Sequence, residues 1–205
     1  MKSNETRIVY AQLDSLRPTQ MTVGRLLVQQ KRRQWRRFSA RKRKLLLKDH
    51  WFPAVLGPNE QIYIIDHHHL GLALAEEGIS SVSVVVLQDY DWLDIPTFWN
   101  IMEYRKWVHP YDELGVRRDF AEIPEYLSGL TDDVYRSVAD SVQRNGGFAK
   151  DTEPYSEFLW ADYFRAAIKL NIATNKFKLA VKRGVRIASE QNARYLPGWT
   201  GEFAK

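Results

Sequence analysis

Apolar residues recur in short alternating or continuous runs over the first ninety positions, a pattern that predicts β-strands. Residues 7–13 are rich in β-branched and aromatic side chains, as strands usually are. Residues 54–56 and 61–65 are separated by turn-forming residues, so we expect them to form a hairpin. Residues 81–87 form the clearest strand, because their alternation gives way to the continuous apolar run typical of a central strand.

Helices are expected between these strands. The segment 16–24 is interrupted by a proline and should be a loop, with Thr22 as the N-cap of a helix that starts near Val23 and continues into residues 31–48. Residues 66–78 have an Ala/Leu-rich body and a terminal glycine, which favours a short helix.

The pattern changes after residue 94. Helical periodicity predicts four segments, near 95–107, 131–144, 155–171 and 173–190. Thr131 or Asp132 is the expected cap of the second segment. We find no strong strand and no internal repeat in this half. The sequence therefore predicts an α+β protein, with an α+β domain over residues 1–93 and an all-helical C-terminal domain over residues 94–205, packed on the first.

Composition narrows the class of protein. The chain of 205 residues has no cysteine, which excludes disulfides, thiolate metal sites and cysteine nucleophiles. Its first residues lack an apolar signal segment, and no run of about 18 apolar residues occurs. We therefore expect a cytoplasmic protein without a membrane partner.

Positive charge is concentrated near the N-terminus. Residues 1–50 hold 14 Lys and Arg against 3 Asp and Glu, and residues 31–48 hold ten cations and no anion. Such a stretch favours a polyanion partner, and nucleic acid and an acidic surface of the protein's own later part are equally consistent with it. A solvated helix face is the plain structural alternative. The candidate nucleic-acid-binding residues are Arg32, Arg33, Trp35, Arg36, Arg37, Arg41, Lys42 and Arg43.

The most informative segment is Asp66-His67-His68-His69, which lies between a predicted strand and a predicted helix. A helix N-terminus can receive a phosphate, and histidines there can donate hydrogen bonds or transfer protons near neutral pH. Asp66 could bind a metal ion, act as a base or cap the helix. The three histidines alone cannot converge on one ion, because successive helical residues project about 100° apart. The plain alternative is a helix start with two solvated imidazoles and one packed imidazole.

This segment resembles the Asp-Gly-His-His-Arg box that proteins of the ParB/sulfiredoxin-like superfamily carry where nucleotide phosphates bind. His67 stands where the family usually has Gly, and Leu70 stands where it has Arg. Five other stretches are similar to the ParB-like nuclease branch. They are residues 16–24, 53–58, 132–137, 146–150 and 157–162.

The resemblance implies a ParB/sulfiredoxin-like fold, in which a small mixed sheet with helices is followed by a helical C-terminal extension. It also implies a nucleotide ligand (ATP, ADP or CTP) with Mg²⁺. The residues expected to contact the nucleotide are Gln20, Thr22, Gly24, Lys31, His67, Arg136 and Lys150.

The leading hypothesis is a nucleotide-dependent enzyme or switch that acts on a phosphate ester or phosphoanhydride, with Asp66, His68 and His69 as catalytic residues and Asp66 as the Mg²⁺ ligand. The alternative is a DNA- or RNA-binding protein or nuclease that uses the basic segment 31–48. A third possibility is a structural family member. It is raised by Leu70 and by residues 28–31, which offer no match to the early glutamate base of a kinase in the superfamily. The sequence leaves the oligomeric state open.

Overall fold

The computed structural model describes residues 7–201, and the chain folds as two units. Of the described residues, the first unit contains 7–23 and 28–131, and the second contains 24–27 and 132–201. Residues 94–131 thus belong to the first unit in the structure. The sequence-based domain boundary at residue 93 stays a prediction.

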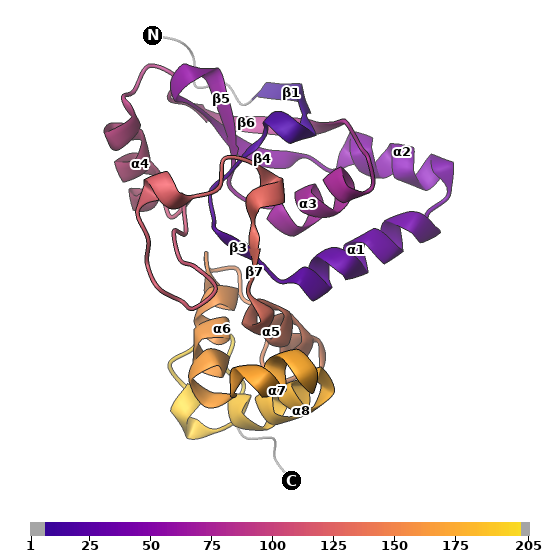
Figure 1. Ribbon diagram of the computed structural model, residues 1–205, viewed down its shortest axis with the longest axis vertical. Helices are drawn as coiled ribbons and strands as arrows, with labels where there is room; N and C mark the ends of the chain where they lie inside the picture. Colours follow the sequence, from indigo (N-terminus) through magenta and orange to yellow (C-terminus); the bar gives the residue numbers. More distant parts are fainter. Residues whose placement is uncertain (1–6, 202–205) are drawn as a thin grey trace. The chain divides into compact units, whose positions relative to one another are not determined.

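The first unit is built on a five-stranded mixed sheet with the strand order β1-β6-β4-β5-β2 (Figure 1). β6 pairs antiparallel with β1 and parallel with β4, and β5 pairs antiparallel with β4 and parallel with β2. The strands are β1 (Arg7–Gln12), β2 (Arg17–Pro18), β4 (Phe52–Gly57), β5 (Gln61–Ile64) and β6 (Ser81–Asp89). The predicted β4–β5 hairpin and the predicted central strand are confirmed.

Four helices accompany this sheet. They are α1 (Arg25–Arg37), α2 (Ala40–Asp49), α3 (His68–Glu76) and α4 (Ile95–Tyr104). Residues of β4 on opposite faces of the sheet belong to different apolar clusters. Phe52 and Ala54 pack in a cluster with residues of α1 and α3. Val55 packs instead with Phe98 and Met102 of α4. α1, α2 and α3 therefore lie beside one face of the sheet, and α4 covers the other (Figure 1).

A short two-stranded sheet joins β3 (Thr22–Val23) and β7 (Thr131–Asp132). The prediction that Thr22 caps the first helix is wrong, because Thr22 lies in β3 and α1 begins only at Arg25. The cap comes instead from Asp132, whose Oδ1 accepts a hydrogen bond from Arg25 N at 2.8 Å. A cap from a residue so distant in the sequence cannot be recognised from local pattern.

The second unit is helical, with α5 (Val134–Arg144), α6 (Ser156–Ala167), α7 (Leu170–Asn175) and α8 (Phe177–Ala188). Its core is a separate apolar cluster that includes Val142, Trp160 and Phe164. α5 is capped by Asp133, whose Oδ1 accepts from Tyr135 N at 3.0 Å, so the prediction of Thr131 or Asp132 as its cap is wrong. The predicted α+β class, a small mixed sheet followed by a helical extension, is confirmed.

Candidate functional site

The candidate site begins where β5 ends and α3 starts. His67 is the residue that precedes α3, and its backbone is left-handed with φ 67° and ψ 19°. Its N–H donates to Oδ1 of the exposed Asp66 at 2.5 Å, which fixes the turn. A residue with a Cβ usually pays about 1–2 kcal/mol for this conformation, which explains why glycine is usual there in the related box. Strain of this kind is commonly retained at functional sites.

A second histidine, which was not predicted from the sequence, contacts His67. His50 follows α2, where its N–H donates to Leu46 O at 2.9 Å, and its ring centroid lies 4.4 Å from that of His67. The ring of Phe52 supports His67 edge-on at 5.7 Å. We call His50 and His67 the imidazole pair. Nε2 of His50 is buried and has no hydrogen-bond partner among residues 7–201, so this edge can bind a further group.

The electrostatics of the imidazole pair favour the neutral form of both rings. Burial lowers the pKa of His67, and the charges of His50 and Lys31 lower it further, whereas the Asp66 carboxylate opposes this. Burial and then the charge of Lys31 likewise lower the pKa of His50. Both shifts mean that Lys31 of α1 lies within electrostatic range of the pair. A lysine, two imidazoles and the positive end of the α3 dipole are groups that can receive an anion.

His68 lies at the inner side of this turn. It is only 4% exposed, and its Nε2 accepts a hydrogen bond from Thr19 N at 3.1 Å. Because Nε2 accepts, the neutral ring has its proton on Nδ1. Thr19 in turn donates from Oγ1 to Ile64 O at 2.9 Å, so His68 and Thr19 fasten the β2–β3 connection to the end of β5. The adjacent His69 is half-buried. Direct catalytic roles for these two histidines stay predictions.

The other residues expected to contact a nucleotide fall into two groups. Gln20 and Thr22 are buried in the first unit, where Gln20 Nε2 donates to Thr22 O at 2.7 Å. Gly24, Arg136 and Lys150 belong to the second unit. Arg136 is buried there, with its guanidinium 3.7 Å from the ring centroid of Phe158 and 3.2 Å from a Glu157 carboxylate oxygen, whereas Lys150 is exposed. Their contacts with a nucleotide stay predictions.

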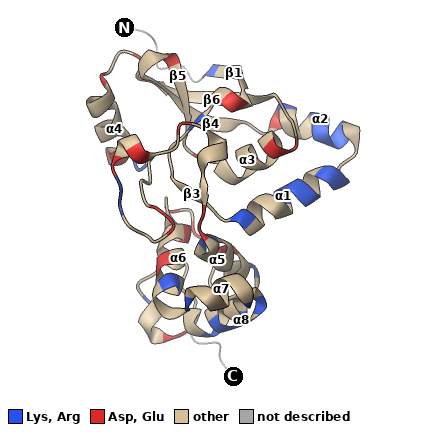
Figure 2. Ribbon diagram, viewed as in Figure 1, with Lys and Arg blue, Asp and Glu red and all other residues tan. Residues whose placement is uncertain are grey.

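The basic segment forms α1 and α2, separated by a break at Phe38-Ser39 (Figure 2). Part of its charge is neutralised by the last turn of α3. Arg32 pairs with Glu76 and Glu77 at 2.6 and 2.7 Å, and Arg36 pairs with Glu77 at 2.8 Å. These two arginines hold the pKa of Glu77 at about 2.

Other members of the basic segment are structural or exposed. Arg43 donates to the carbonyls of Trp35 and Arg36 at the end of α1. Lys42 lies over the Phe38 ring, 4.2 Å from its centroid. Trp35 is 5% exposed and belongs to the core, which leaves little of its ring for base stacking. The exposed cations without an ion-pair partner in the described part of the chain are Arg33, Arg37, Arg41, Lys42, Lys44 and Lys48.

Asp66 was the expected magnesium ligand. No group of three or more His, Asp or Glu residues that could hold a metal ion occurs within residues 7–201. One exposed carboxylate fits the usual manner of Mg²⁺ binding, in which one or two carboxylates act together with substrate phosphates and water. Asp66 would then supply the single protein ligand of an ion that arrives with a phosphate.

Comparison with known proteins agrees with this fold. Over residues 9–166 the chain matches the model of the family described as "Putative ParB-like nuclease". A matching solved structure is that of protein Atu1540 from Agrobacterium tumefaciens. It shares 38% identity over 97% of this chain and 98% of that chain, with a TM-score of 0.91. No curated protein matches.

The α+β fold and the family match over residues 9–166 define a ParB-like protein. The extent of the family match makes the assignment specific: the chain belongs to the ParB-like nuclease family. None of the helices within residues 7–201 has the length and apolar character needed to cross a bilayer.

Proposed function

We propose that the chain binds a nucleotide through its phosphates at the N-terminus of α3 and acts there on a phosphate ester or phosphoanhydride. The observation that supports this most is the imidazole pair beside Lys31, with the buried Nε2 of His50 lacking a partner among residues 7–201. Neutral, half-buried imidazole rings, a lysine and a helix N-terminus are groups that phosphoryl chemistry uses for proton transfer and charge stabilisation.

Different residues of the chain would have different roles in this reaction. The Lys31 ammonium and the α3 dipole would stabilise the negative charge of the phosphate. One imidazole of the pair would accept a proton from the attacking water or hydroxyl while the bond from phosphorus to the leaving oxygen breaks, and that oxygen would leave with the bonding electrons. Asp66 would hold Mg²⁺, which shields phosphate charge when bound. His68 would keep the turn in place through Thr19.

Ligand-induced stabilisation tests this directly. We would measure the melting temperature with ATP, ADP, CTP and GTP in the presence of Mg²⁺. A ligand at 100 times its dissociation constant adds about 2.7 kcal/mol, a shift of several degrees in a chain of this size. We expect one nucleotide to raise the melting temperature, His50→Ala and Lys31→Gln to abolish the rise, and Lys44→Gln to preserve it. An unchanged rise in the His50 and Lys31 variants would refute the site.

A second candidate function, nucleic-acid binding or cleavage, is favoured by the exposed cations of α1 and α2 that have no ion-pair partner in the described part of the chain. It predicts that fluorescence anisotropy detects binding of single- or double-stranded DNA that weakens steeply with salt, because neutralised phosphates release counterions. Arg37→Gln with Arg41→Gln should reduce the salt slope by about 2. Binding that is insensitive to salt, or to these two substitutions, would remove this candidate.

A further inference from the structure

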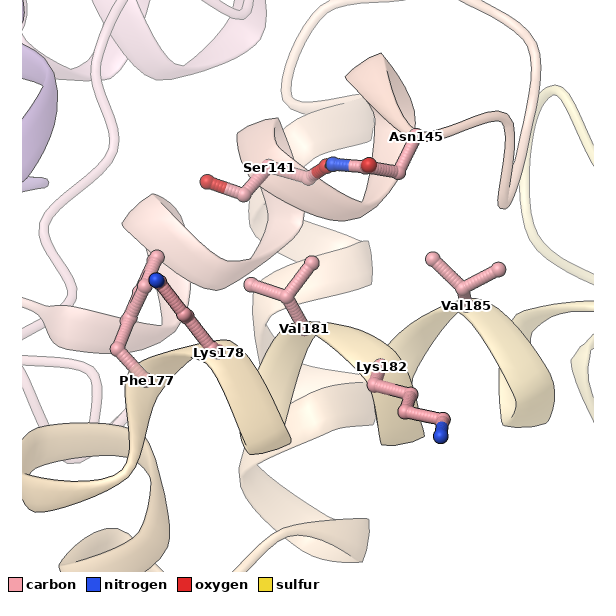
Figure 3. A pocket seen from close by; sticks show the side chains of 7 residues that line it. All are labelled: Ser141, Asn145, Phe177, Lys178, Val181, Lys182 and Val185. Atoms are coloured by element: carbon pink, nitrogen blue, oxygen red, sulfur yellow. The ribbon is translucent and has the colours of Figure 1, made fainter.

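An open groove lies within the second unit, between α5 and α8 (Figure 3). Its volume is about 520 Å³. Phe177, Val181 and Val185 of α8 form its apolar floor, and Ser141 and Asn145 of α5 stand opposite. A second hollow of about 450 Å³ shares Phe177 and Lys178 with this groove and is also lined by Asn175, Lys176 and Leu179.

The spacing of residues on α8 explains why this surface is apolar on one side and cationic on the other. Ala180 and Gly184 face the core of the second unit, and a Cβ on Gly184 would lie 2.4 Å from Cγ2 of Val142, so only glycine allows α5 and α8 to approach this closely. The floor residues follow at intervals of four on the adjacent stripe of the helix. The next stripe, again at intervals of four, is Lys178, Lys182 and Arg186, all exposed.

The charge beside the groove is unbalanced. Residues 163–189 contain seven Lys and Arg and no Asp or Glu. Arg186 has an acidic neighbour in Glu190 at 3.8 Å, but this pair is exposed and therefore contributes little. Lys178 and Lys182 have no ion-pair partner among residues 7–201, although they line the groove. An occupant that supplies apolar side chains and carboxylates together would complement both stripes.

We propose that the α5–α8 groove docks an acidic amphipathic helix of a partner protein. The apolar residues of that helix would rest on Phe177, Val181 and Val185, and its Asp or Glu residues would meet Lys178 and Lys182. The distance along α8 from Phe177 to Val185 is about 12 Å, so two turns of a partner helix would span the floor. Recognition of this type places residues at i, i+4 and i+7 in the groove.

Nucleic acid fits this groove less well. Two of the three floor residues are valines, which offer no ring on which a base could stack, and the cations lie along only one side of the floor. A partner helix, by contrast, is suited to an apolar centre with charges at the rim.

The probe is a fluorescein-labelled peptide of about 18 residues, long enough to form a helix, with Leu at i, i+4, i+7 and i+11 and Glu along one flank. A second peptide has Lys in place of every Glu. Anisotropy with the full-length chain should detect saturable binding of the Glu peptide and much weaker binding of the Lys peptide. We expect Lys178→Glu with Lys182→Glu, and separately Val181→Asp, to weaken binding by about tenfold or more.

Arg183→Glu is the matched control, because it reverses one exposed charge on the same helix outside both stripes, and it should leave binding nearly unchanged. Far-UV circular dichroism and melting verify folding, and Lys178→Gln with Lys182→Gln replaces the charge reversal if that variant fails to fold. The proposal is overturned if the Glu peptide shows no saturable binding, if the Lys peptide binds equally well, or if single-stranded DNA displaces the peptide through Lys178 and Lys182.

Discussion

The left-handed backbone at His67 reverses the usual order of stability between glycine and alanine. We consider two variants, His67→Gly and His67→Ala, which both remove the imidazole ring and with it the contacts to His50 and Phe52. Those ring contacts are worth about 0.5–1.5 kcal/mol beyond burial, and their loss is common to the two variants. The variants therefore differ mainly in how their backbones tolerate a φ of 67°.

The size of the difference follows from two opposing terms. Alanine in the left-handed region costs about 1–2 kcal/mol that glycine avoids. Glycine, in turn, loses about 0.4–1 kcal/mol relative to alanine, because its unfolded chain has more conformational freedom. We therefore expect His67→Gly to be more stable than His67→Ala by about 1 kcal/mol, which is about 2–4 °C in melting temperature for a chain of this length.

Urea unfolding monitored by tryptophan fluorescence would measure this difference. Lys44 provides the matched control, because it is exposed inside α2, where alanine should be more stable than glycine by about 1 kcal/mol. The order of the two residues should thus be opposite at positions 67 and 44. If His67→Ala proves as stable as His67→Gly, or more stable, the left-handed turn before α3 does not exist in solution and the proposed site loses its geometry.

Four further predictions concern close packing, capping, the pH dependence of stability and proton uptake. A Cβ on Gly24 would lie 2.6 Å from Ser137 Oγ, so Gly24→Ala should lower the free energy of unfolding by about 1–3 kcal/mol in urea titrations, and an unchanged midpoint would contradict this contact. Asp132→Ala should cost about 1 kcal/mol in the same assay, because it removes the acceptor of Arg25 N, whereas Asp132→Asn should cost less; equal losses would argue against capping. Both rings of the imidazole pair have pKa values below the ordinary 6.5 in the folded chain. As the pH falls, the same two histidines therefore take up protons in the unfolded chain before they do so in the folded chain. The free energy of unfolding should thus decrease as the pH drops from about 6.5 through the pKa values of the folded chain. A bound phosphate should raise the same pKa values, so titration calorimetry in buffers of different ionisation enthalpy should detect proton uptake on nucleotide binding, and its absence would separate the phosphate from the imidazoles.

The parts of the fold that could be predicted are those specified by local pattern. The run at residues 81–87 is apolar on both faces of a central strand, and turn residues between 57 and 60 determine the β4–β5 hairpin. The errors arose where a distant residue supplies a partner. Asp132 caps α1, which is distant in the sequence, whereas its neighbour Asp133 caps α5. No local signal distinguishes these two neighbouring acids.

The strand-to-helix junction could be predicted from the sequence, whereas the side chains that gather around it could be predicted only in part. The junction after β5 was recognisable because an acid and three histidines follow a strand, and Lys31 was included as a cation of the first helix. The sequence does not predict His50, because a single histidine before a strand forms no recognisable pattern. His50 approaches His67 only because β4 and β5 pair in the sheet. His68 was singled out for chemistry, whereas the sequence could not reveal that its Nε2 is occupied by Thr19.

The division of α1 between the two units has a consequence for synthesis of the chain. Residues 24–27 belong with residues 132–205, although they are made more than a hundred positions earlier, while the rest of α1 belongs to the first unit. On the ribosome, all residues of the first unit are present once residue 131 has emerged. The first turn of α1 gains its cap only when Asp132 also emerges. We expect the order of translation to leave this turn frayed until the second unit appears, so a chain that stalls near residue 131 would be most exposed to proteases at residues 24–27.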